Sequence, residues 1–84
     1  MVIVDSTDRI AGYPVVRQHP LDDGRVVVVD RGEQYRNRYC VAWQPHDARG
    51  WANGVLLEDF AVAIEVFIVR CDGEHRAREY PRHR

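Results

Sequence analysis

The sequence contains no lysine, and its twelve strongly basic residues are all arginine. This absence excludes chemistry that needs a lysine amine, including Schiff-base formation and the phosphate-binding lysine of a P-loop. Aliphatic hydroxyl groups are almost as scarce, because Ser6 and Thr7 are the only serine and threonine. The sequence also lacks a carboxylate pair on a recognisable catalytic scaffold and a glycine-rich phosphate-binding motif. We therefore expect a protein that is not an enzyme and has no catalytic residues.

Long apolar runs are missing as well. No segment reaches the roughly 18 consecutive apolar residues that a membrane helix needs. The N-terminal MVIVDSTDR has neither the basic region nor the long apolar region of a signal peptide. The net charge of -1 at pH 7 provides no overall positive field for nucleic acid or an anionic membrane. These features predict a cytoplasmic protein that does not bind membranes, and its 84 residues are enough for one domain.

What the sequence does contain is a series of apolar segments typical of strands, separated by turn formers. The clearest is residues 25–30, RVVVVD, whose four consecutive valines indicate a central strand covered on both faces. Further strands are expected at residues 13–17, 35–43 and 51–57.

A helix is predicted after the last of these strands. Glu58 and Asp59 provide an acidic start that suits a helix N-terminus, and Asp72-Gly73 provides a stop signal. The helix would therefore run from about residue 59 to residue 70. Because VAIEVFIV is rich in β-branched residues, the same segment would also serve as a strand, and that alternative stays open.

The expected architecture is α+β, with a small antiparallel sheet of three to four strands and one C-terminal helix packed on one face. The single α+β domain would span residues 13–73. Residues 1–12 would form an N-terminal arm or an edge strand. Residues 74–84 would form a flexible arginine-rich tail, because they offer a core almost nothing to bury.

The predicted helix is apolar on two sides. At about 100° per residue, one side carries the residues expected to face the sheet, which are Phe60, Ala63, Ile64, Phe67, Ile68 and Cys71. The opposite side carries Val62, Val66 and Val69, interrupted by Glu65. Monomers avoid large exposed apolar surfaces, so these four positions are predicted to form a protein interface. The alternative is that the N-terminal arm or the tail covers them within the monomer.

Two thiols and two loop imidazoles offer the ligand types of a structural zinc site: Cys40, His46, Cys71 and His75. Zinc sites normally bring ligands in tight pairs such as C-x2-C, whereas here the spacings are C-x5-H and C-x3-H. We therefore expect no metal site and no cofactor, and two free thiols rather than a disulfide.

The arginines suggest a different kind of partner. Residues 70–84 carry five arginines against three carboxylates, so positive charge is concentrated at the C-terminus. Basic tails of this sort can grip phosphates. The possible nucleic-acid-binding residues are Arg36, Arg38, Arg76, Arg78, Arg82 and Arg84.

The runs DGRVVVVDRG and RYCVAW precede a spaced pattern of Trp51, Gly54, Glu58, Asp59, Phe60, Ala63, Phe67 and Arg70. Together they resemble a group of small proteins from actinobacteria and their phages, in which a strand hairpin, a Trp/Gly strand and a helix follow in order. The likeness covers residues 13–71 and transfers no active-site residue. It implies a phage or mobile-element accessory protein that acts by binding a host or phage macromolecule, for example as an inhibitor of a host protein. We therefore expect a non-enzymatic module whose partner is a host protein or a second copy forming a homodimer, with nucleic acid as the alternative.

Overall fold

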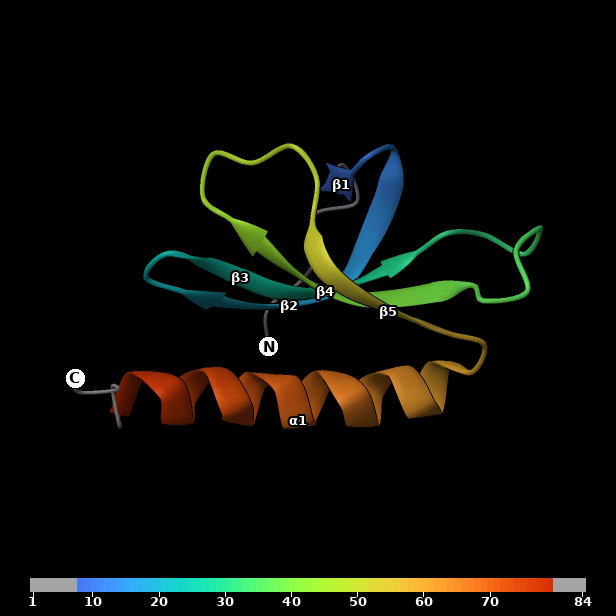
Figure 1. Ribbon diagram of the computed structural model, residues 1–84. Helices are drawn as coiled ribbons and strands as arrows, with labels where there is room; N and C mark the ends of the chain where they lie inside the picture. The colour runs from blue at the N-terminus through green and yellow to red at the C-terminus, as the bar shows by residue number, and fades with distance from the viewer. Residues whose placement is uncertain (1–7, 80–84) are drawn as a thin grey trace.

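The computed structural model describes residues 8–79, which form five strands and one helix (Figure 1). In chain order these are β1 (Arg9–Ile10), β2 (Tyr13–Leu21), β3 (Gly24–Asp30), β4 (Tyr39–Pro45), β5 (Ala52–Leu57) and α1 (Phe60–Glu79). The strands form one antiparallel sheet in the order β1-β2-β3-β4-β5. Helix α1 lies across one face of it. The α+β class and the single helix on one face are confirmed, but the sheet has five strands instead of three to four.

Strand β3 lies at the centre of the sheet and contributes to two hydrophobic cores. All four valines at residues 26–29 are fully buried. Because side chains alternate across a strand, Val26 and Val28 belong to the helix-side core with Ala63. The outer core, on the face away from the helix, consists of Ile10, Val15, Val27, Val29, Cys40 and Ala42. The prediction that this strand is covered on both faces is confirmed.

The fifth strand comes from the predicted N-terminal arm. Ala11 and Gly12 have φ values of 54° and 86°, and two consecutive positive φ values are what a type I′ hairpin turn requires. They connect β1 to β2 and bring Ile10 into the outer core. Residues 1–7 of that arm lie outside the described residues.

Strand β2 is longer than expected and continues to Leu21, where the sequence predicted an end at residue 17. Its last residues stay paired with β3, with Pro20 opposite Arg25 and Leu21 opposite Gly24. Long-range pairing therefore outweighs the local turn signal of the HPLDDG segment. Strand β4 begins later than predicted, at Tyr39 and not at residue 35.

Helix α1 begins where the sequence predicted, which settles the choice between helix and strand. The Asp59 carboxylate accepts a hydrogen bond from the Ala61 N–H at 2.8 Å and caps the helix. The predicted stop near Asp72-Gly73 is wrong, since the helix continues to Glu79. Residues 74–79 of the predicted tail are therefore helical, and residues 80–84 lie outside the described residues. No helix within residues 8–79 combines the length and apolar character that crossing a bilayer requires.

Contacts with the β2–β3 hairpin explain why the helix continues past Gly73. The Nε2 atoms of His75 and His19 lie 2.7 Å apart, and the Arg78 guanidinium pairs with Asp23 in the turn. The Arg78 guanidinium also lies 5.5 Å from the centre of the Trp43 ring. These contacts offset the roughly 1 kcal/mol by which glycine disfavours a helix interior.

We expect removal of residues 74–84 to lower the melting temperature by roughly 5 °C or more, because about 1 kcal/mol corresponds to 4–8 °C in a domain of this size. Arg78→Ala should reproduce much of that loss. Arg76→Ala is the matched control, since Arg76 pairs with Asp72 on the helix surface, and it should leave the melting curve unchanged. Equal shifts for the two single variants, measured by circular dichroism, would contradict packing of the last helical turns on the hairpin.

Candidate functional site

The orientation of helix α1 decides which of its apolar residues remain available to a partner. Ala63 is fully buried in the helix-side core, and Val66 and Phe67 pack against that core. Val62 and Val69 are exposed, and Glu65 is exposed beside them. Three of the four predicted interface residues therefore face outward. The expectation that Val66 points away from the sheet is wrong. The side of the helix that faces the sheet is centred on Ala63 and Phe67, and Val66 packs at its border.

This orientation of α1 also exposes a residue on the side that was expected to face the sheet. Ile68 was expected to face the sheet, yet it is 60% exposed. Ala63 is small enough for the helix backbone to come close to the central strands, and this close approach fixes the helix around it. The hydrophobic pattern alone did not distinguish the two orientations, because both sides of α1 are apolar.

Strand β5 forms one edge of the sheet and carries two exposed apolar side chains. Val55 is paired with Val41 and therefore lies on the helix side, whereas Leu56 is paired with Cys40 and lies on the outer side. Helix and edge strand are joined by Arg70, whose Nη1 donates to the carbonyl of Asn53 at 2.6 Å.

Val62 and Val69 lie on the same side of α1 as Arg70, within about 100° around the helix axis. Arg70 connects this part of the helix to β5. Four side chains, 42–71% exposed, make up what we call the β5 rim: Val55, Leu56, Val62 and Val69.

A pocket of about 380 Å³ opens on the outer side of the β5 rim. We call it the Trp51 pocket; its lining residues are Tyr13, Arg31, Cys40, Trp51, Gly54 and Leu56. The Tyr13 and Trp51 rings lie 6.3 Å apart and form an aromatic wall. The wall continues to Tyr35, whose hydroxyl lies 3.2 Å from that of Tyr13, and this hydrogen bond raises the pKa of Tyr35.

The pocket depends on a glycine in β5. A Cβ atom at Gly54 would lie 2.8 Å from the Cys40 Sγ and 2.9 Å from the Trp51 Nε1. The pairing of β4 with β5 shifts register at this point, and Asn53 has a positive φ of 54°. Bulges of this kind occur at sheet edges and beside binding sites, where they redirect side chains. Asn53 and Gly54, which lie within the predicted strand 51–57, thus shape the pocket.

Two groups at the Trp51 pocket differ in their chemistry. Burial raises the pKa of the Cys40 thiol, so it stays protonated near neutral pH and is a poor nucleophile. The Arg31 guanidinium lies 4.1 Å from the centre of the Tyr35 ring and donates to the carbonyl of Asn37 at 2.9 Å. Among the described residues that line the pocket, Arg31 is the one that carries a charge.

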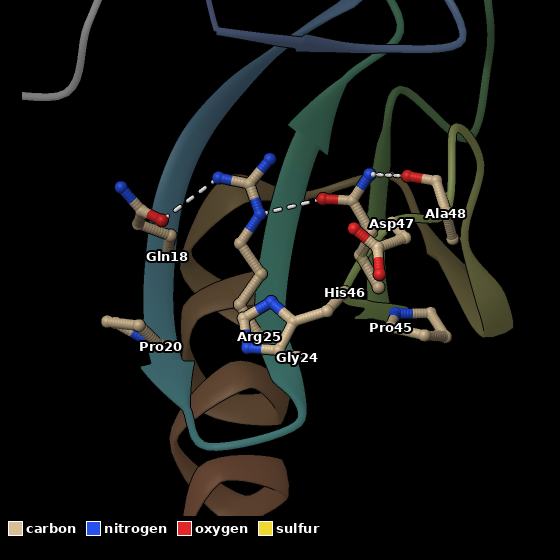
Figure 2. Close-up of a pocket in the computed structure, with 9 residues that line it drawn as sticks. Gln18, Pro20, Gly24, Arg25, Pro45, His46, Asp47 and Ala48 are labelled. Carbon is tan, nitrogen blue, oxygen red and sulfur yellow. Dashed lines mark hydrogen bonds between the residues drawn. The ribbon is translucent and has the colours of Figure 1, made fainter.

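A second pocket, of about 290 Å³, lies between β2, β3 and the loop after β4 (Figure 2). Arg25 projects into it and donates to Gln18 at 2.9 Å and Gln44 at 2.7 Å. It also holds both carboxylate oxygens of Asp8, at 2.7 and 3.0 Å. With its donors engaged within the chain, this guanidinium serves the fold and not a ligand.

The described arginines of the predicted nucleic-acid site are each paired with a carboxylate. Arg38 donates to both oxygens of Asp30 at 2.7 and 2.9 Å, and these hydrogen bonds hold the pKa of Asp30 below its usual value. Arg36 pairs with Glu58 at 3.2 Å. Arg76 pairs with Asp72 at 3.1 Å, and Arg78 pairs with Glu74 and Asp23.

These arginines do not form one surface. Arg36 pairs with Glu58 just before the start of α1, whereas Arg76 and Arg78 lie in the last turn of the helix. Arg82 and Arg84 lie outside the described residues.

The possible zinc ligands are also separated. Cys40 belongs to the outer core and Cys71 packs on the helix-side core, so the sheet lies between the two free thiols. The His46 Nε2 lies 2.8 Å from the carbonyl of Asp22, and His75 contacts His19. Across residues 8–79, no three His, Cys, Asp or Glu side chains gather as a metal-binding group.

Comparison of the chain with protein-family models, with curated proteins and with solved structures gives no match.

Proposed function

We propose that the protein is a non-enzymatic binding module whose β5 rim contacts a partner protein. The observation that carries this proposal is the exposure of four apolar side chains, two on the edge strand β5 and two on the helix that Arg70 connects to that strand. Burial of such side chains is the main favourable contribution to protein association. The resemblance to small phage and actinobacterial proteins supports a cytoplasmic accessory role in which the partner is a host protein.

Nucleic-acid binding is the second candidate function, favoured by the number of arginines near the C-terminus. Phosphate contacts would have to replace the ion pairs that Arg36, Arg38, Arg76 and Arg78 already make. The net gain from each contact is smaller for that reason, and the two clusters lie at different ends of the helix. We therefore rank it below protein binding.

We expect the paired substitution Val62→Glu and Val69→Glu to abolish capture of a partner protein from a lysate, while the melting temperature changes by no more than about 2 °C. Two charges would be buried without partners in the complex but would stay solvated in the free protein. Capture is measured by affinity pull-down and mass spectrometry. Val66 is a poor choice for this test, because it packs on the helix-side core.

The matched control is the paired substitution Arg36→Gln and Arg76→Gln, which should leave capture unchanged. Loss of capture in this control, or after nuclease treatment of the lysate, would favour nucleic-acid binding. Retention of the same captured protein by the Val62→Glu, Val69→Glu variant would contradict the β5 rim as the contact surface.

A further inference from the structure

We propose that the β5 rim binds an extended, acidic segment of the partner protein, which lies beside β5 and inserts one apolar side chain into the Trp51 pocket. This inference rests on the proposed function and adds the chemical class of the segment that the protein would bind. Three features carry it: an open strand edge, a pocket next to that edge, and two arginines that have no carboxylate partner within residues 8–79.

The outer edge of β5 is open within residues 8–79, because β5 is the last strand of the sheet and pairs only with β4. An open edge presents backbone N–H and C=O groups that an added strand can satisfy. The irregular register at Asn53 and Gly54 restricts regular pairing to Val55, Leu56 and Leu57. A short extended segment therefore fits this edge better than a long strand.

The Trp51 pocket would make the binding of such a segment specific for its sequence. Peptides that add to a sheet edge gain affinity from backbone hydrogen bonds and specificity from pockets that receive alternate side chains. Leu56 belongs both to the open edge and to the pocket lining, so a side chain from a neighbouring strand would reach the pocket directly. Tyr13 and Trp51 form its aromatic wall, which favours an apolar side chain.

Two arginines near the pocket and β5 favour acidic residues on either side of the apolar side chain of the incoming segment. Arg31 at the pocket and Arg70 beside Asn53 donate to backbone carbonyls, at 2.9 and 2.6 Å. In the part of the chain that the structure describes, neither makes an ion pair, in contrast to Arg25, Arg36, Arg38, Arg76 and Arg78. Carboxylates on the incoming segment would complement both guanidinium groups.

The same charges argue against a second copy of the chain as the occupant. A twofold-symmetric interface brings the same patch of both subunits together. One interface would then contain the guanidinium groups of Arg31 and Arg70 from both copies, and such an excess of like charge opposes association. The rim is better suited to an acidic segment of a different protein.

Selection from a phage-displayed library of random dodecapeptides, with the full chain immobilised, tests this inference. We expect the selected peptides to share an apolar residue flanked by Asp or Glu. A synthetic peptide of the selected sequence should quench or shift tryptophan fluorescence on binding. Arg31→Gln and Leu56→Lys should each weaken its affinity by about 10-fold or more, because each removes a contact made in the complex. Arg49→Gln, at an exposed arginine outside the pocket, should change nothing.

Several results would overturn the inference. These are failure to select any binding peptide, selection of basic motifs, equal effects of Arg31→Gln and Arg49→Gln, and peptide binding that appears only after residues 1–7 are removed. A dimer in light scattering that the peptide dissociates would identify a second copy as the occupant. If these tests fail while lysate capture still depends on Val62 and Val69, protein binding stands and the extended-segment inference alone is wrong. If capture does not depend on Val62 and Val69 either, the proposed function fails with it.

Discussion

Replacing Val27 with aspartate is expected to unfold the protein as completely as replacing Val28 with aspartate. Both valines are fully buried, but they belong to different cores, Val27 to the outer core and Val28 to the helix-side core. A carboxylate buried without a partner costs several kcal/mol, a large part of the roughly 5–15 kcal/mol by which small domains are stable. Circular dichroism and urea unfolding of the two variants measure the effect.

The alanine variants at the same positions show whether the two cores contribute equally to the free energy of unfolding. Val27→Ala and Val28→Ala should each lower the free energy of unfolding by about 2–3 kcal/mol, from lost burial and the cavity left behind. Val69→Asp, on the exposed helix side, is the surface control and should change it by about 0.5 kcal/mol or less. A Val27→Asp variant that remains folded would show that the face away from the helix does not need a closed core.

Arg25→Met is expected to destabilise the protein by about 2–3 kcal/mol, less than the 3–5 kcal/mol typical of a fully buried pair. The side chains of Arg25 and Asp8 are each only 20% exposed, so the variant leaves a largely desolvated carboxylate without its partner. Methionine keeps the apolar stem of the arginine in place. Arg36→Met is the control, because that side chain is 87% exposed, and it should cost less than about 0.5 kcal/mol.

A double-mutant cycle in urea isolates the Arg25–Asp8 contact. Asp8→Asn combined with Arg25→Met should cost clearly less than the sum of the two single changes, because each single change leaves one partner unsatisfied. Additive effects would mean that the pair does not connect the N-terminal segment to the sheet.

Some parts of the fold follow from local sequence alone. Four consecutive valines identify a strand buried on both faces, since no alternation leaves a polar side for solvent. Asp59 marks the start of α1, because a side-chain oxygen at that point satisfies a free backbone N–H. Both features depend on residues that are neighbours in the chain, and both agree with the structure.

The candidate site, by contrast, was only partly visible in the sequence. The helical periodicity predicts an apolar surface at Val62 and Val69, whereas the pattern at Val55 and Leu56 predicts only a strand. Nothing in the spacing of Tyr13, Arg31 and Trp51 indicates that three separate segments meet in one pocket. A pocket of this kind depends on which strands lie side by side, and that is a property of long-range pairing.

The amino-acid sequence by itself determined the α+β class, the central strand and the start of the helix, because composition and short-range periodicity are sufficient for each of these. Only the tertiary structure decided the rotation of α1, its continuation to Glu79 and the pairing of Arg25 with Asp8. Each of these results from contacts between residues far apart in the chain. A helix with two apolar sides can face a sheet with either one, and packing of Ala63 against the central strands selects between them.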